Sequence, residues 1–226
     1  MKFLLTNDDG IEAKGLALLA DVCAKLGEVT VVAPDCEQSG VGHRVNTREP
    51  LKLQQLANGH ALSGTPADCT RIGMRALHSG ADWVISGLNH GGNMGVDINM
   101  SGTVAGAREG AILGAQAIAI SQVLSVRHPP DIARMRLTTE RVLRELLGRP
   151  LQQGQLYNVN LPFAPESDEP EIVLCAPDPS PHDVKFDIVQ GGYQYSGVFL
   201  NRPRIKGLDV DVVFAGKIAV SVLTIV

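Results

Sequence analysis

Two adjacent carboxylates, Asp8 and Asp9, close the first apolar segment of the chain, and Gly10 follows them. Residues 2–6 are typical of a buried parallel strand, and Gly10 indicates the turn that ends it. Adjacent carboxylates repel each other, so one of them should resist ionisation. A hard divalent cation such as Mg²⁺ or Mn²⁺ would offset this charge, because it prefers oxygen ligands. The alternative is an ordinary turn in which one aspartate caps the next helix.

Further oxygen ligands follow two other predicted strands. Ser39 lies in the loop after the strand expected at residues 29–34, and Asn89 follows the strand expected at residues 83–87. The carboxyl ends of neighbouring parallel strands share one edge of a sheet, which is where ligands bind in open α/β proteins. These two neutral side chains and the two aspartates could therefore surround one cation and leave positions for water and phosphate oxygens.

A possible phosphate cradle precedes the helix expected from Val104 to Leu113. Residues 101–103, with the sequence SGT, offer two hydroxyl groups and free N–H groups at the start of that helix. An ordinary helix cap is the alternative. Because Ser101 lies outside the expected helix, it distinguishes phosphate binding from capping. The glycine-rich residues 91–95 match neither a Walker loop nor a dinucleotide-binding fingerprint.

The elements that must position these residues alternate between strand and helix. Strands are expected at residues 2–6, 29–34, 83–87 and 117–121. Helices are expected at residues 15–25, 103–113 and 130–148, and a further helix begins after its N-cap, Thr65. This rhythm predicts an α/β fold, a parallel sheet with helices on both faces. A hairpin is expected within residues 51–62, around an Asn-Gly turn.

Composition changes after the expected helix at residues 130–148. Prolines separate short strands there, and residues 185–226 are expected to form β-ribbon. We therefore expect an α/β core at residues 1–150 and a smaller β-rich segment at residues 151–226 that completes it.

Composition also limits the class of protein. The 226 residues are 44% hydrophobic and 19% charged, with a formal net charge of −4. This balance argues against a duplex nucleic-acid binder, which normally has a basic face. Neither a signal peptide nor an apolar stretch of about 20 residues occurs, so a cytoplasmic protein without a membrane partner is expected. The cysteines lack any CxxC spacing, and Cys23 and Cys69 are expected to be small buried residues.

Several motifs occur in order and at a suitable spacing along the first half of the chain. They are TNDDG at residues 6–10, VAPD with SG at 32–40, GTPADC at 64–69, SGLN at 86–89 and SGTV at 101–104. Together they resemble the SurE family of metal-dependent 5′/3′-nucleotidases, over roughly residues 1–125. NVNLP at residues 158–162 extends the resemblance.

The resemblance implies one divalent cation per subunit, Mg²⁺ or Mn²⁺. Its ligands would be Asp8, Asp9, Ser39 and Asn89. A phosphate site would lie around Asn93, Ser101, Gly102 and Thr103. Family members often carry Gly-His at the position of His43, which favours a substrate-side role over a solvated loop histidine. The resemblance also implies a Rossmann-like α/β catalytic core at residues 1–150. It implies a homodimer or homotetramer built through C-terminal segments, to which residues 151–226 would contribute.

The expected reaction is phosphomonoester hydrolysis. Asp8 or Asp9 would accept the proton of an attacking water molecule, and hydroxyl and amide groups would stabilise the charge on phosphate. An aspartyl-phosphate intermediate is less favoured, because the phosphatases best known for it carry Asp-x-Asp. The expected substrates are nucleoside 5′- and 3′-monophosphates, with polyphosphate as a further candidate. The alternative from another class is a non-catalytic, metal-dependent nucleotide-binding regulator.

Overall fold

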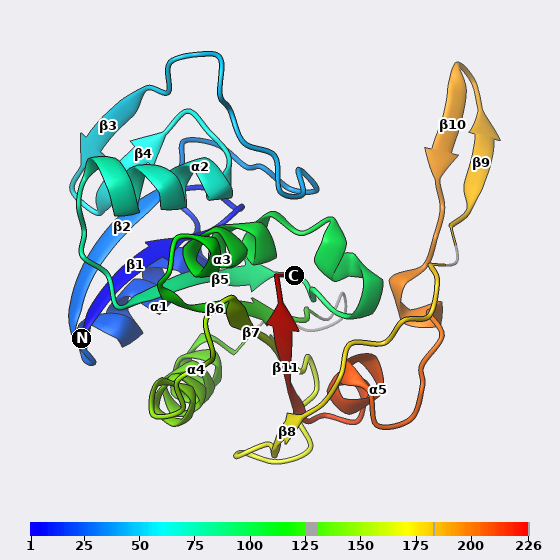
Figure 1. Ribbon diagram of the computed structural model, residues 1–226. Helices are drawn as coiled ribbons and strands as arrows, with labels where there is room; N and C mark the ends of the chain where they lie inside the picture. Colours follow the sequence, from blue (N-terminus) through cyan, green and yellow to red (C-terminus); the bar gives the residue numbers. More distant parts are fainter. Residues whose placement is uncertain (125–130, 183, 226) are drawn as a thin grey trace.

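A twisted, mostly parallel sheet forms the centre of the computed structural model, which describes residues 1–124, 131–182 and 184–225 (Figure 1). Within these residues the sheet has nine strands in the order β3-β4-β2-β1-β5-β6-β7-β11-β8. The strands are β1 (Lys2–Thr6), β2 (Glu28–Pro34), β3 (Leu53–Leu56), β4 (Gly59–Leu62), β5 (Trp83–His90), β6 (Gln116–Gln122), β7 (Gln155–Leu161), β8 (Ile172–Leu174) and β11 (Ile218–Thr224). The pairs β3–β4 and β7–β11 are antiparallel, and the other neighbours are parallel.

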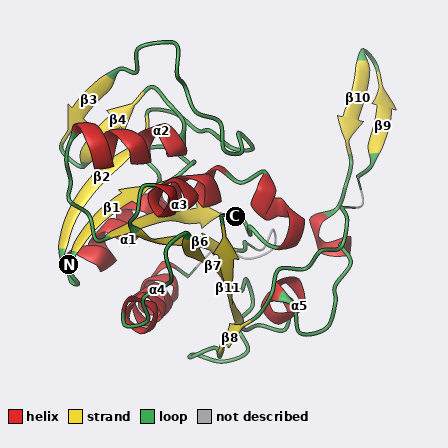
Figure 2. Ribbon diagram, viewed as in Figure 1, coloured by secondary structure: helices red, strands yellow, loops and turns green. Residues whose placement is uncertain are grey.

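Helices cover both faces of the sheet, which confirms the predicted α/β class (Figure 2). The α-helices of the described chain are α1 (Lys14–Ala24), α2 (Pro66–Arg71), α3 (Gly102–Ile112), α4 (Ile132–Leu147) and α5 (Asp209–Phe214). Shorter helical turns lie at Ile72–Ala76, Gly95–Asn99 and Phe199–Asn201. Pairs α1–α4 and α2–α3 are packed together. The expected helix start at Pro130 lies outside the described residues.

Successive side chains of β1 pack on opposite faces of the sheet, which explains why its central residues are all apolar. Phe3 and Leu5 pack in the cluster that contains residues of α1 and α4, whereas Leu4 packs in a cluster with Cys69 of α2. Both faces of β1 are therefore covered, as is typical of a parallel strand in an α/β sheet. Cys23 and Cys69 are buried free thiols, as predicted.

The start of α2 follows the predicted capping pattern. The Thr65 hydroxyl accepts a hydrogen bond from the Asp68 N–H, and the Asp68 carboxylate accepts one from the Thr65 N–H. Pro66 occupies the first turn. This reciprocal arrangement satisfies two N–H groups that a helix start otherwise leaves unpaired. The hairpin predicted within residues 51–62 is also present, and it extends the edge of the sheet.

Two predicted boundaries near the site were wrong. Strand β5 continues past Gly87 to His90, with a register shift between Ser86 and Asn89, so Asn89 belongs to the strand. Helix α3 begins at Gly102, so Ser101 is its N-cap. Both changes bring side chains that were expected in loops onto the ends of regular elements.

The C-terminal segment contributes to the sheet and extends beyond it. Strands β7, β8 and β11 join the central sheet, whereas β9 (Phe186–Val189) and β10 (Gly192–Tyr195) form a separate hairpin that projects from the body (Figure 1). The expectation of β-ribbon throughout the tail was wrong at α5. Its valines favour a strand, but the buried Asp209 accepts backbone N–H groups and fixes the helical turn. Val226, the last residue of the expected β-ribbon, lies outside the described residues.

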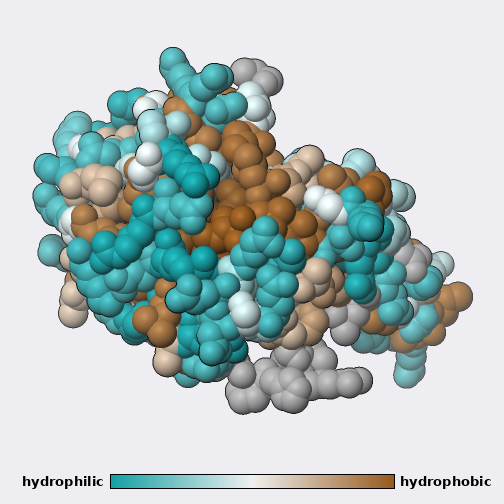
Figure 3. Space-filling model, turned by 90° about the horizontal axis from the view of Figure 1, so that it is seen from below, coloured by the Kyte–Doolittle hydropathy of each residue, from teal (hydrophilic) through white to brown (hydrophobic). Residues whose placement is uncertain are grey.

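The molecular surface is hydrophilic over much of the face seen from below, with apolar residues gathered near its centre (Figure 3). No helix in the described part of the chain has the length and apolar character that crossing a membrane requires.

Candidate metal and phosphate site

One open cavity of about 760 Å³ brings five of the nine predicted site residues together at the carboxyl edge of the sheet. Its lining includes Asp8, Ser39, Asn89, Asn93 and Ser101, whereas Asp9, His43, Gly102 and Thr103 are not among the described residues that line it. The ends of β1 and β5 meet the start of α3 at this place, as expected for the ligand-binding edge of an α/β sheet.

Asp8 is buried, with only 6% of its surface exposed. Its Oδ1 accepts a hydrogen bond of 2.5 Å from Thr103 Oγ1. A Cβ atom at position 102 would lie 2.8 Å from the Asp8 Cβ, closer than real Cβ atoms approach a neighbour. Gly102 therefore allows the start of α3 to pack directly against the aspartate. The Thr103 hydroxyl, which was predicted to bind phosphate, donates its hydrogen to Asp8 in this structure.

The two aspartates are costly to ionise in this environment. Burial raises the pKa of Asp8, and the charge of Asp9 raises it further, whereas hydrogen bonds from Thr103 oppose the shift. Burial also raises the pKa of Asp9, against the opposing effect of His90, whose backbone N–H lies 3.3 Å from Asp9 Oδ2. A bound cation would favour the ionised form of both carboxyl groups.

The neutral residues near the aspartates offer oxygen atoms. Asn89 Nδ2 donates to the Gly91 carbonyl at 2.9 Å, which leaves its Oδ1 as an acceptor. Ser39 Oγ donates to Glu37 Oε1 at 2.6 Å and keeps lone pairs for another partner. In the described residues no three His, Cys, Asp or Glu side chains are grouped to hold a metal, so a cation here needs neutral ligands too. This all-oxygen donor set fits Mg²⁺ or Mn²⁺.

Ser101 combines two possible roles. Its Oγ accepts the Val104 N–H at 3.0 Å, which makes it the N-cap of α3. The same hydroxyl can donate its hydrogen to a ligand in the cavity. The cap interpretation and the phosphate interpretation are therefore compatible.

A buried amide network that sequence reasoning missed holds Asn93. Its side-chain Nδ2 donates to Ser121 Oγ at 2.8 Å, and its backbone N–H donates to Asn160 Oδ1 at 2.8 Å. The Asn93 carbonyl accepts from Nδ2 of both Asn158 and Asn160. Asparagines two residues apart share one face of a strand, and buried amides require partners. The Asn-x-Asn spacing at residues 158–160 was the sequence signal that could have predicted this network.

His43, predicted on the substrate side, contacts a buried carboxylate. His43 Nε2 lies 2.7 Å from Glu109 Oε2, and Arg71 Nε lies 2.7 Å from Glu109 Oε1. Glu109 is 1% exposed, and His43 is not among the described residues that line the cavity. Burial alone would raise the pKa of Glu109, but the hydrogen bonds from His43 and Arg71 outweigh it and hold this pKa below its usual value.

Glu109 should make the stability of the protein depend on acid pH. A carboxyl group with a lowered folded-state pKa stabilises the fold above the ordinary pKa of 4.5, and this contribution is lost as the pH falls toward the folded-state value. Glu109→Gln should therefore cost on the order of 1–3 kcal/mol near neutral pH, because it weakens a buried pair. The cost should shrink near pH 4.

Urea unfolding at both pH values measures this difference. Glu145→Gln, which removes an exposed ion pair with Arg149, is the matched control and should show little change at either pH. An equal loss of stability for Glu109→Gln at both pH values would show that packing, and not charge, is responsible.

The fold and the cavity define an α/β protein with an open cavity, lined by carboxylate, hydroxyl and amide groups, at the edge of a mostly parallel sheet. Residues 3–178 match the family model described as Survival protein SurE. The chain belongs to the SurE family, as its motifs predicted.

Known proteins resemble the chain over nearly its whole length. It is 43% identical over 227 residues to a Synechocystis sp. protein named "Putative 5′-nucleotidase", with 100% of both chains covered. It is 39% identical over 235 residues to 5′-nucleotidase SurE of Brucella canis, covering 99% of this chain and 92% of the relative. The crystal structure of SurE protein from Aquifex aeolicus has a TM-score of 0.86 at 31% identity, covering 98% of this chain and 92% of the other.

Proposed function

We propose that the chain is a divalent-cation-dependent phosphomonoester hydrolase that releases phosphate from nucleoside 5′-monophosphates. The observation that carries this proposal is the convergence of Asp8, Asn89 and Ser101 on one cavity. The names of the Synechocystis and Brucella relatives support the choice of substrate. Nucleoside 3′-monophosphates and polyphosphate are further candidate substrates.

The cation would be held by the two aspartates with Ser39 and Asn89, one cation per subunit. Asp8 supplies a buried carboxylate, and Asn89 supplies an amide oxygen that is not used by the Gly91 contact. When bound, such a cation polarises a phosphoryl oxygen as a Lewis acid.

Residues of the chain bind the phosphate group and accept a proton from water. The Ser101 hydroxyl donates to a phosphate oxygen at the start of α3, where the N–H groups and the helix dipole favour an anion. Asn93, held in place by its amide network, lines the same cavity. Asp8 or Asp9 accepts the proton of the attacking water molecule. The products are inorganic phosphate and the free nucleoside.

Phosphate release from each nucleoside monophosphate, with Mn²⁺ or Mg²⁺ and with EDTA, tests the proposal. We expect turnover that depends on the cation and returns when the cation is restored. Nucleotide binding without any phosphate release would instead support the regulator that is the alternative. Parallel assays with 3′-monophosphates and tripolyphosphate rank the further candidate substrates.

We also propose a homodimer or homotetramer in which the β9–β10 hairpin takes part. Apolar side chains on it are exposed, with Ile188 at 84% and Tyr193 at 77% exposed. Exposed apolar groups that are grouped in this way favour association. Replacing both with serine should lower the mass measured by sedimentation, and an unchanged mass would contradict the role of the hairpin.

A further inference from the structure

The site cavity has two chemically different sides. Asp8, Asn89 and Ser101 form its polar side. Its lining also includes a set of apolar and aromatic side chains, namely Met100, Val123, Leu124, Phe163 and Phe199. Its volume of about 760 Å³ falls in the range of about 300–1,000 Å³ that holds drug-sized ligands, well beyond the needs of one phosphate group. The cavity therefore suits a phosphate ester with a large, partly apolar alcohol.

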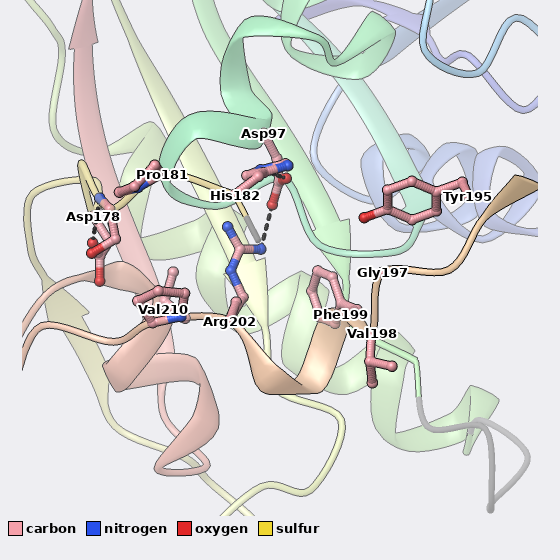
Figure 4. Close-up of a pocket in the computed structure, with 12 residues that line it drawn as sticks. Asp97, Asp178, Pro181, His182, Tyr195, Gly197, Val198, Phe199, Arg202 and Val210 are labelled. Atoms are coloured by element: carbon pink, nitrogen blue, oxygen red, sulfur yellow. Dashed lines mark hydrogen bonds and ion pairs between the residues drawn. The ribbon is translucent and has the colours of Figure 1, made fainter. Parts of the chain in front are cut away.

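A second cavity of about 210 Å³ adjoins the first and shares Asp97 and Phe199 with it (Figure 4). The Phe199 ring is 42% exposed. The Arg202 guanidinium lies 5.1 Å from the centre of that ring. Phe199 thus presents an accessible aromatic ring at the junction of the two cavities.

The polar groups beside Phe199 are paired with one another. Arg202 Nη1 lies 2.5 Å from Asp97 Oδ2, and His182 Nε2 lies 2.6 Å from Asp97 Oδ1 (Figure 4). The Arg202 guanidinium and the His182 ring both contact the same Asp97 carboxylate, so this wall is poorly suited to a second phosphate group. An aromatic ring beside compensated charges suits a flat, uncharged group instead.

We propose that Phe199 binds the nucleobase of the substrate while the phosphate lies at the Ser101 side of the cavity. This inference rests on the proposed function and assigns a residue to the other end of the substrate. Bases stack on aromatic side chains through the π-face that every base has. Phe199 would therefore make the protein prefer nucleotides to phosphate esters that lack a base.

Adenosine 5′-monophosphate and ribose 5-phosphate test this directly, because they differ in the base alone. The measured quantity is the ratio of their kcat/KM values in the wild type, Phe199→Leu and Phe199→Tyr. We expect the wild type to prefer the nucleotide by roughly tenfold or more, and Phe199→Leu to lose most of that preference. Phe199→Tyr keeps the ring and should keep the ratio.

Leu137→Ala is the control, since it removes an exposed apolar side chain of α4 that lines neither cavity. Its ratio should equal that of the wild type. A wild type without preference, or a Phe199→Leu ratio equal to the wild-type ratio, would overturn the inference. A Phe199→Leu protein that lost tripolyphosphate hydrolysis but kept its preference for the nucleotide would also overturn the inference. If the wild type hydrolyses ribose 5-phosphate but not the nucleotide, the base subsite is wrong while phosphatase activity stands; if it hydrolyses neither, both proposals fail.

Discussion

Asp8→Asn should lower phosphate release at saturating Mn²⁺ by at least about a hundredfold, or roughly 2.7 kcal/mol of transition-state free energy. The substitution removes a negative charge from the centre of the proposed cation site. The metal-free variant should be at least as stable as the metal-free wild type. Burial and the charge of Asp9 raise the pKa of Asp8, so its ionised form costs stability at neutral pH, and the amide removes that cost.

Activity assays and thermal unfolding in EDTA measure the two effects on one preparation. The amide introduced by Asp8→Asn retains an oxygen that can accept the Thr103 hydrogen bond, so the fold should be kept. Asp21→Asn, at an exposed aspartate paired with Arg136, is the control and should leave turnover unchanged. A fully active Asp8→Asn protein would rule out a ligand role for this residue.

The second large effect is expected at Ser101, where capping and phosphate binding can be separated. Glycine is nearly as good an N-cap as serine, so Ser101→Gly should cost only a few tenths of a kcal/mol, whereas Ser101→Ala should cost about 1 kcal/mol. Both variants lose the hydroxyl. Both should therefore lose about tenfold or more in kcat/KM, which is roughly 1.4 kcal/mol.

Asp131→Ala provides the comparison, because Asp131 caps α4 in the same way, through a hydrogen bond from the Arg134 N–H. It should lower stability about as much as Ser101→Ala and leave kcat/KM unchanged. If Ser101→Gly kept its full catalytic efficiency, the serine would be a cap alone, and the phosphate would have to be held elsewhere.

The sequence predicted the central sheet well because each strand carries its own signal. The apolar run that contains Phe3 and Leu5 is buried on both faces, and the Thr65 capping box is local. The start of α3 was missed because glycine is a poor helix residue. Position 102 nevertheless needs glycine, since any Cβ would collide with Asp8. That requirement comes from tertiary structure, which local propensity does not report.

Contacts between distant residues were the part that the sequence could not show. His43 and Glu109 are 66 positions apart, and nothing near either residue indicates the other. The substrate-side prediction for His43 came from the family resemblance, which does not indicate the contact with Glu109. The bonds from Asn158 and Asn160 to Asn93 likewise span 65 and 67 positions. The rule that the carboxyl ends of parallel strands share one edge of the sheet predicts which strand ends lie close together. No such rule predicts pairs of side chains that are distant in sequence.

A crystal structure of the protein with Mn²⁺, with the cation located by its anomalous scattering, tests the central claim most directly. We predict one cation per subunit that is bound by side-chain oxygens of Asp8, Asp9, Ser39 and Asn89, with the remaining positions of an octahedron taken by water. Asn89 is the decisive ligand, because its amide must reach the aspartates from β5. A cation bound elsewhere, or an Asn89 oxygen remote from it in an active protein, would contradict this account.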